Sequence, residues 1–513
     1  MSVTPAPPTT SRLRRSGAAR RSGLTRGRWI DHWRPDDAAF WEREGRAIAR
    51  KNLAFSIFAE HIGFSIWVLW GIVAINLGNV GIQLSLAETF WLTALPNLVG
   101  SFLRIPYTFA VPRFGGRAWT TISAALLLVP TLLLALLVPS GWLADQSKDT
   151  QLWVLMLCAA TAGVGGGNFS SSMANISFFY PEGRKGMALG LNAAGGNLGV
   201  AVAQLLVPLV IIIGVPAAAV KVSPHEVHLA YAGLMWLPLI VLAAFGAWRY
   251  MDSLTEARSD KGAYVGAARE PHAWIMSLLY IGTFGSFIGY SFALPLVIKN
   301  TFPEFLAQHA FIATYLAGLG FVGALIGSIA RPLGGWLADR VGGARVTLAC
   351  FAGMAAFTLL AIVGVSERSF PLFFGAYCVI FALAGAGNGS TYRMIPAIFA
   401  ALGGRHGDDE GTRLSFKRRA AAVIGIAGAI GAFGGFLIQL VFREASLSVT
   451  KAVQAAATPA EKVRVATENA DWSIGALWVF LVAYLVLGAL TWFFYLRPGR
   501  STGPVVNVAG ATV

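Results

Sequence analysis

Ala330-Arg331-Pro332-Leu333 places an arginine inside an otherwise apolar segment, and Arg340-Val341-Gly342-Gly343 begins nine residues after that arginine. The same arrangement occurs earlier, where Leu103-Arg104-Ile105-Pro106 is followed at the same spacing by Arg113-Phe114-Gly115-Gly116. Nine residues span roughly 13 Å of an α-helix. The repeat therefore predicts two equivalent halves, each holding one arginine at the same depth.

Arg104 and Arg331 should be costly to bury. A charged side chain within a membrane costs several kcal/mol unless it is compensated, and an anionic substrate would supply the compensation. Alternatively, the arginines could extend to the membrane surface or bind carbonyl groups that Pro106 and Pro332 leave free. We favour compensation by an anionic substrate, because extension to the membrane surface does not by itself explain why the arginine recurs at equal depth. Both interpretations stay open.

The composition indicates a membrane protein. Of 513 residues, 56% are hydrophobic and only 13% are charged, and the mean hydropathy is +0.62. Soluble chains carry about 25% charged residues. Apolar runs of about 20 residues, long enough to cross a bilayer as helices, recur along the whole chain. The expected fold class is an all-α polytopic membrane protein.

The formal net charge of +15 could indicate nucleic-acid binding, but its distribution favours membrane topology. Lys and Arg crowd the first 51 residues and the short loops after every second predicted span, while the alternate loops carry few. Basic loops stay in the cytoplasm. We therefore expect a cell-membrane protein with both termini in the cytoplasm, contact with membrane lipid and no nucleic-acid partner.

Twelve spans are predicted, at roughly 52–78, 88–112, 118–138, 152–175, 186–213, 229–250, 272–298, 311–338, 345–364, 371–393, 418–442 and 473–496. They divide the chain into a cytoplasmic N-terminal segment (1–51), a six-helix bundle (52–250), a cytoplasmic inter-domain loop (251–271), a second six-helix bundle (272–496) and a cytoplasmic tail (497–513). Residues 1 to about 30 are predicted to be disordered, and Trp29 to Arg50 to lie along the membrane interface as an amphipathic segment.

The two bundles share more than the arginines. Gly165-Gly166-Gly167-Asn168-Phe169-Ser170 in the fourth span matches Gly385-Ala386-Gly387-Asn388-Gly389-Ser390 in the tenth. Gly195-Gly196-Asn197-Leu198-Gly199 in the fifth span has a glycine-rich counterpart in the eleventh, although Phe433 stands opposite Asn197. Parallel six-helix repeats with a site between them are a transporter architecture.

Gly334-Gly335-Trp336-Leu337-Ala338-Asp339-Arg340-Val341-Gly342 resembles the inner-loop motif of the major facilitator superfamily. The earlier copy keeps Arg113 and Gly115 but has Pro112 in place of the acid. The segment 165–181, GGGNFSSSMANISFFYP, is similar to the nitrate/nitrite porter (NarK-type) family of that superfamily. This resemblance runs from about Trp33 to the twelfth span and implies two pseudo-symmetric bundles of six transmembrane helices.

The family resemblance implies proton-linked nitrate uptake, or exchange of nitrate for nitrite, by alternating access. It implies that Arg104 and Arg331 clamp the anion. It assigns the remaining substrate contacts to Asn197, Phe64, Phe169, Tyr280 and Phe284. It also assigns an inner-loop gating role to Gly335, Asp339, Arg340, Gly342 and Arg113.

The chemistry of these residues suits nitrate. A guanidinium is planar and donates two parallel hydrogen bonds to a flat oxyanion, which a lysine cannot do. Two arginines would leave an empty site near +2 and an occupied site near +1, so an anion should draw the halves together. Aromatic faces would strip water from the ion and fix its plane. Simple packing roles for the aromatic residues and for the glycines remain open.

Glu60 and His61 are the candidates for proton coupling. Glu60 is the one carboxylate that we place well inside a predicted span, roughly 12 Å from the start of the first helix and near the depth of Arg104. An intramembrane acid is a candidate proton carrier, and a neighbouring histidine can titrate near neutral pH. Adjacent helical residues point about 100° apart, so at most one should face the site. A purely structural counter-ion role for Glu60 stays open.

Three functions are weighed: nitrate/proton symport, which we favour, nitrate/nitrite antiport without protons, and a non-transporting anion sensor. A sensor would need a larger cytoplasmic domain than a tail of 17 residues. Cys158, Cys350 and Cys378 lie in apolar segments, and neither metal-ligand spacing nor a nucleophile–base pair is evident. We expect a monomer that is not an enzyme and has no cofactor or metal.

Overall fold

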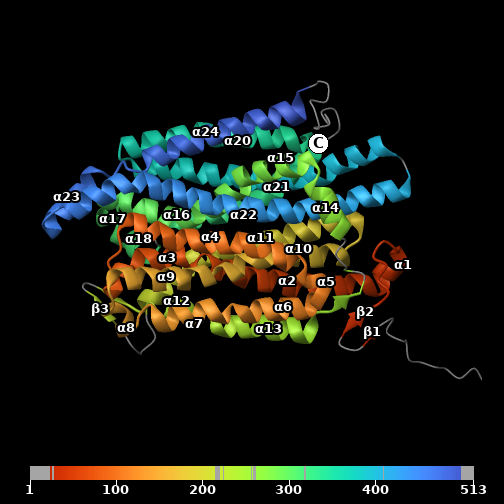
Figure 1. The fold of residues 1–513 in the computed structure, drawn as a ribbon, viewed down its shortest axis with the longest axis horizontal. Coiled ribbons are helices and arrows are strands. Elements are labelled where there is room, and N and C mark those ends of the chain that lie inside the picture. The colour runs from red at the N-terminus through yellow and green to blue at the C-terminus, as the bar shows by residue number, and fades with distance from the viewer. Residues whose placement is uncertain are drawn as a thin grey trace, which may run out of the picture.

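A computed structural model describes residues 24–25, 28–213, 220–222, 225–255, 257, 261–316, 319–407 and 409–497. The predicted disorder at the N-terminus and the predicted tail therefore fall largely outside the described residues. The described chain is mostly helical, and its long helices run side by side along the longest axis of the molecule (Figure 1). Helices satisfy their own backbone hydrogen bonds, as a bilayer requires.

The first half of the chain forms a bundle of long helical segments, several broken by a short turn. Its elements are α1 (Ala38–Phe40), α2 (Arg46–Trp67), α3 (Leu69–Asn76), α4 (Leu86–Thr108), α5 (Ala110–Phe114), α6 (Gly116–Leu126), α7 (Leu128–Leu137), α8 (Gly141–Ala144), α9 (Lys148–Thr161), α10 (Gly163–Phe179), α11 (Glu182–Ile213), α12 (Tyr231–Leu234) and α13 (Leu237–Tyr250).

The second half repeats this pattern. Its elements are α14 (Lys261–Ala268), α15 (Pro271–Tyr280), the π-helical turn η3 (Ile281–Gly285), α16 (Ser286–Thr301), α17 (Pro303–Gln308), α18 (Ala310–Tyr315), α19 (Gly320–Val341), α20 (Gly343–Ser366), α21 (Phe370–His406), α22 (Glu410–Ala455), α23 (Pro459–Glu468) and α24 (Ile474–Thr491).

Eleven helical segments among the described residues are long and apolar enough to cross a membrane. The helix α4 completes the predicted twelve, because it packs against α10 and α22 within the bundle. Its polar residues Glu88, Asn97 and Arg104 make it less apolar than a typical spanning helix.

Some helix bounds differ from the prediction. The predicted eighth span is two helices, because α18 ends at Tyr315 and α19 begins only after Leu319, whose φ is +69°. The tenth and eleventh spans are longer than predicted, and α22 alone has 46 residues. The prediction used hydrophobicity, which marks only the apolar part of a helix. These two helices continue beyond their apolar parts into polar sequence.

Two helix pairs, α4 with α22 and α11 with α19, join the halves along the bundle. Gln439 of α22 links the first pair, since its Oε1 accepts from Thr93 Oγ1 of α4 at 2.8 Å, while its Nε2 donates to the carbonyl oxygen of Gly289 of α16 at 2.7 Å. Where α3 meets α16, Lys299 Nζ donates to the carbonyl oxygen of Ile75.

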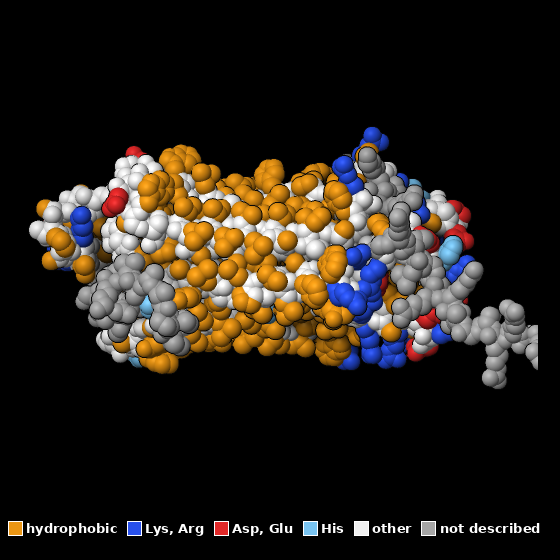
Figure 2. Space-filling model, turned by 90° about the horizontal axis from the view of Figure 1, so that it is seen from below, with side chains coloured by type: hydrophobic (Ala, Val, Ile, Leu, Met, Phe, Trp, Pro, Cys, Tyr) orange, Lys and Arg blue, Asp and Glu red, His pale blue; other side chains and the backbone are white. Residues whose placement is uncertain are grey.

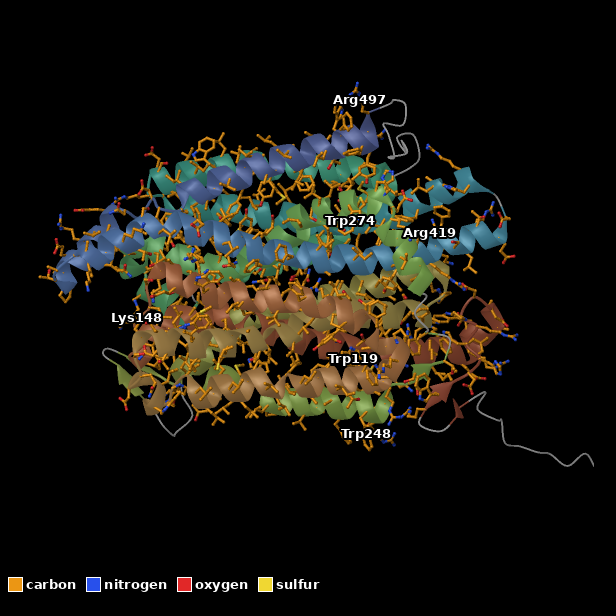
Figure 3. The ribbon with its side chains drawn as sticks, viewed as in Figure 1. Trp119, Lys148, Trp248, Trp274, Arg419 and Arg497 are labelled. Carbon is orange, nitrogen blue, oxygen red and sulfur yellow. The ribbon has the colours of Figure 1, made fainter. Side chains whose placement is uncertain are left out.

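A belt of hydrophobic side chains covers the middle of the molecule, and Lys and Arg gather at one end of it (Figure 2). We call this the basic end. Arg113, Arg249 and Arg340 lie in the last turns of α5, α13 and α19. Figure 3 places Arg419 and Arg497 at this end too. The charge pattern read from the sequence is thus a real asymmetry between the two ends.

A small sheet at the basic end ties the N-terminal segment to the first bundle; its strands are β1 (Leu24–Thr25), β2 (Trp29–Ile30) and β5 (Ser253–Leu254). Asp252, beside β5, is 3% exposed. Its carboxylate accepts from Arg28 Nε at 3.1 Å, Lys51 Nζ at 2.7 Å and Asn52 Nδ2 at 3.1 Å. A further hairpin, β3 (Val220–Val222) with β4 (His225–Val227), lies at the opposite end (Figure 1).

The aromatic residues of the N-terminal segment do not face a membrane surface, contrary to our prediction. Trp33 and Trp41 are each 4% exposed. The Trp33 ring lies 5.5 Å from the Phe179 ring, and the Trp41 ring lies 5.6 Å from the Tyr180 ring. A tertiary contact has therefore replaced the interfacial placement that amphipathicity alone suggested.

In each half, a glycine one helical turn before the arginine packs against a glycine of a neighbouring helix. These glycines are Gly100 before Arg104 and Gly327 before Arg331. A methyl group on Gly163 of α10 would come within 2.7 Å of the backbone nitrogen of Gly100 of α4. A methyl group on Gly385 of α21 would come within 2.1 Å of the carbonyl oxygen of Gly327 of α19. These contacts bring the two helices of each pair into backbone contact.

The turns after the two arginines also match. Gly115 links α5 to α6 with φ 83° and ψ 151°, and Gly342 links α19 to α20 with φ 93° and ψ 134°. Residues with a side chain rarely adopt this conformation, so both positions require glycine. The internal repeat predicted from the sequence is confirmed in the backbone.

We predict that Gly385→Ala destabilises the protein by about 1–3 kcal/mol, because the added methyl group forces α19 and α21 apart. The measurement is thermal unfolding in detergent. Gly375→Ala is the matched control, since it lies in the same helix and a methyl group there meets nothing within 4 Å. Equal melting temperatures for the two variants would contradict the close contact.

Candidate anion-binding site

Arg104 lies in α4, is fully buried and uses part of its hydrogen-bonding capacity on the protein. Its Nε donates to the carbonyl oxygen of Gly166 at 3.0 Å, and its Nη1 donates to that of Gly428 at 2.6 Å. Gly166 belongs to α10 in the same half and Gly428 to α22 in the other, so the guanidinium bridges the halves. Its buried Nη2 has no hydrogen-bond partner within the described chain.

Arg331 is the counterpart in α19 and is 5% exposed. Its Nη2 donates to the hydroxyl of Tyr280 at 3.3 Å. Its buried Nη1 is without a hydrogen-bond partner among the residues that the structure describes. Each half therefore contributes one buried guanidinium with a terminal nitrogen left over.

Both guanidiniums face one aromatic ring. The ring centroid of Phe169 lies 4.8 Å from Cζ of Arg104 and 5.6 Å from Cζ of Arg331. The distance between the two Cζ atoms therefore cannot exceed the sum of these two distances. The alternative that they extend to the membrane surface is wrong, since both lie inside the molecule.

The burial of these charges is only partly offset by the protein. A cation–π contact contributes about 0.5–2 kcal/mol. Leaving a buried charge without its counter-ion costs about 3–5 kcal/mol. No salt bridge to Arg104 or Arg331 occurs within the described part of the chain. The pair thus keeps positive charge and unpaired N–H donors inside the bundle.

The predicted aromatic residues form one row. The ring of Phe169 lies 5.9 Å from that of Phe64 and 6.1 Å from that of Phe284. Phe284 in turn stacks on Tyr280 at 5.4 Å with an interplanar angle of 12°. Since all four are fully buried, the row excludes water from the arginines.

A π-helical turn shapes the C-terminal side of this row. The turn η3 (Ile281–Gly285) joins α15 to α16, directly after Tyr280 and around Phe284. Such turns are rare and are frequent at functional sites. The two glycines of this turn, Gly282 and Gly285, were the only local signal in the sequence, and we did not predict it.

Glu60 on α2 is fully buried beside the arginines. Its Oε2 accepts from Asn168 Nδ2 at 3.2 Å, and the carboxylate interacts electrostatically with Arg104. Asn168 Oδ1 accepts from Ser171 Oγ at 2.7 Å, and Ser171 accepts from Trp119 Nε1 at 3.0 Å. The depth inferred for Glu60 is confirmed: it lies within the electrostatic field of Arg104 and at the end of a hydrogen-bonded chain.

His61 and Asn197 occupy other surroundings. His61 Nδ1 lies 3.0 Å from the carbonyl oxygen of Gly195 on α11. Asn197 of the same helix is fully buried, and neither of its amide atoms has a hydrogen-bond partner in the described chain. A methyl group on the adjacent Gly196 would lie 2.9 Å from Glu60 Cγ, so this helix packs directly against the acid.

The predicted gating residues lie outside the arginine cluster, at the ends of α5 and α19: Arg113, Gly335, Asp339, Arg340 and Gly342. Asp339 pairs with Arg393 of α21. The guanidinium of Arg340 lies 3.9 Å from the ring of Trp336. These contacts brace the second half internally.

Two residues near the site were missed by sequence reasoning. A methyl group on Gly428 would lie 3.6 Å from Ser170 Oγ and 3.9 Å from both Arg104 Nη1 and Tyr392 Oη. Tyr392 also lies beneath the guanidinium of Arg331 at 5.5 Å. Tyr392 follows the glycine segment of α21, and Gly428 belongs to the glycine-rich stretch of α22, so these two segments were the available signal.

Among the described residues, no group of three or more His, Cys, Asp or Glu side chains could hold a metal ion. The cluster instead offers unpaired N–H donors, flat aromatic faces and one carboxylate. This set can bind and release a small anion and can exchange a proton.

The model of the Major Facilitator Superfamily matches residues 53–439 of this chain. A nitrate/nitrite transporter of Salmonella typhimurium, NarU, is 38% identical over 483 residues, covering 91% of this chain and 96% of the relative. The chain belongs to the nitrate/nitrite transporter family of that superfamily. A Thermus thermophilus relative, named a probable nitrate/nitrite antiporter (NarK2), is 36% identical over 80% of this chain and 88% of its own length.

Solved structures support the fold. A partially occluded inward-open structure of the xylose transporter XylE from E. coli matches with a TM-score of 0.60 and 12% identity, covering 88% of this chain and all of that one. At this identity the match concerns the fold alone. The prediction of two pseudo-symmetric six-helix bundles is confirmed.

We predict that Phe169→Leu weakens oxyanion binding about tenfold, because two cation–π contacts worth about 0.7 kcal/mol each are lost. Calorimetric titration with sodium nitrate measures the change. Phe90→Leu is the control: Phe90 is equally buried and stacks on Phe442 at 5.8 Å. Similar affinities in the two variants would show that the shared ring does not position the arginines.

Proposed function

We propose that this chain is a secondary transporter that carries nitrate and nitrite across the cell membrane by alternating access. The observation that supports this best is the pair of buried guanidiniums, each with an unpaired nitrogen, over one aromatic ring. Two such donors suit a flat oxyanion of single charge. The nitrate/nitrite transporters among its relatives support the same substrate.

The proposed orientation has both termini in the cytoplasm. Lys and Arg gather at the basic end, whereas Figure 3 places Lys148 at the other end of the bundle (Figures 2 and 3). Basic residues are retained on the cytoplasmic side. The same residues can contact anionic lipid headgroups. A monomer contains both arginines, so the proposed site needs no second copy.

Charge balance supports coupling to one proton. With Glu60 ionised, the acid and the two arginines sum to one positive charge. Binding of one nitrate and one proton leaves that sum unchanged, whereas nitrate alone lowers it and a proton alone raises it. The loaded and empty transporters thus present the same charge to the membrane, which favours movement of the two ions together.

Strict nitrate/nitrite exchange is the second candidate. The Thermus relative named as a probable antiporter favours it. In that mechanism Glu60 would be a fixed structural counter-ion of Arg104. Exchange requires an anion in each direction and no proton.

We predict that wild-type protein in proteoliposomes takes up nitrate down an inward proton gradient and carries protons with it. Glu60→Gln should abolish proton entry and spare nitrate/nitrite exchange, because the amide cannot ionise. A pH-sensitive dye and nitrate uptake are followed together. Nitrate affinity should rise with falling pH in the wild type and be independent of pH in the variant.

Glu304→Gln is the control, since Glu304 is a surface acid 3.8 Å from Arg368. Wild-type exchange without proton movement would favour the antiporter instead. No nitrate movement in any mode would reject the transport proposal.

A further inference from the structure

The helix α14 (Lys261–Ala268) lies in the segment that connects the two halves and packs on α22 at the basic end (Figure 1). A methyl group on Gly266 would lie 3.0 Å from Arg419 Nε, and Ala267 is fully buried. Figure 3 shows Arg419 at this end of the molecule. The connecting segment is therefore attached to the second half by close packing.

Tyr264 of α14 reaches across to the first half. Its ring lies 5.2 Å from that of Phe109, and its hydroxyl hydrogen-bonds Thr108 of α4. A methyl group on Gly425 of α22 would lie 3.5 Å from Tyr264 Oη and 3.8 Å from Thr108 Oγ1. One tyrosine thus contacts both α4 and α22, the pair of helices that joins the halves.

This contact lies one turn from the anion site. Thr108 Oγ1 donates to the carbonyl oxygen of Arg104 at 2.7 Å. On the facing helix, Gly425 precedes Gly428, whose carbonyl oxygen accepts from Arg104 Nη1. One helical turn corresponds to about 5 Å. Because α4 ends and α22 begins at the basic end, Tyr264 lies between the arginines and that end.

The hydroxyl keeps its proton. Burial raises the pKa of Tyr264 to about 12, so the group remains a hydrogen-bond donor at neutral pH. Thr108 uses its own proton on the carbonyl oxygen of Arg104, so its oxygen is the acceptor.

We propose that Tyr264 is the gate on the cytoplasmic side of the anion site, carried by the connecting segment rather than by a membrane helix. This proposal rests on the proposed function, because an alternating-access transporter must close the cytoplasmic side of the site while the site is open to the opposite side. Opening between α4 and α22 must break the contacts of Tyr264 with one of these helices.

The test places a cysteine beneath the tyrosine. Gly425→Cys has room for its Cβ, since the atoms nearest to that position are at ordinary contact distance. Its reaction rate with an impermeant maleimide is measured in the full-length protein in detergent. The protein without this substitution supplies the background from its own cysteines, of which Cys158 and Cys350 are buried.

Adding Tyr264→Phe to this variant should raise the rate about fivefold, the shift that loss of one hydrogen bond produces in a two-state equilibrium. Adding Tyr264→Ala should raise it further, because the ring is lost too. Val265→Ala, at an adjacent exposed side chain, should leave the rate unchanged.

An unchanged rate in both tyrosine variants, or an equal rise with Val265→Ala, overturns the gate. The readout needs no nitrate, so it separates failure of the gate from failure of the proposed function. If the cysteine becomes more reactive but the protein does not bind nitrate, the gate proposal stands and the nitrate proposal is rejected.

Discussion

Two positive charges buried within reach of one aromatic ring are the constraint on which the rest of the structure depends. The ring of Phe169 and a few carbonyl groups stabilise the guanidiniums of Arg104 and Arg331 without neutralising them. An anion between the two guanidiniums would supply the missing opposite charge, as the proposed function requires. The backbone around the cluster is closely packed at its glycines.

Glycines make that packing possible. The carbonyl oxygen of Gly166 is reached by Arg104, and a methyl group on Gly166 itself would lie 2.4 Å from the ring of Trp67. Because glycine has no side chain, backbone carbonyl groups at such positions can come close to the arginines. The glycine-rich segments thus serve packing and electrostatics at once.

The repeat also explains how the two halves differ. Glu60 precedes Phe64 by four residues, and Tyr280 precedes Phe284 by four. In the second half the arginine donates to the phenol, whereas in the first half the arginine lies in the field of a carboxylate. Equivalent positions therefore hold a neutral group and a titratable one. Proton sensitivity is thus expected from the first half alone.

The sequence predicted the spanning helices, the repeat and the cluster well, because each leaves a local record. Apolar length marks a helix, and Arg104 and Arg331 stand out against apolar neighbours. The sequence could not show the role of Tyr392 or the π-helical turn beside Phe284, since both depend on contacts between distant segments. For the same reason Trp33 and Trp41 were wrongly predicted to lie at the membrane interface. An amphipathic segment that packs on the protein and one that lies on a membrane have the same sequence pattern.

The central proposition is that both guanidiniums hold one flat anion through paired, directional hydrogen bonds. The most direct measurement is nitrate binding by the wild type against Arg104→Lys and Arg331→Lys, which keep the charge but remove the planar fork. Paired bonding predicts a large loss of affinity in each variant. Near-normal affinity in both would contradict it, because charge alone would then suffice.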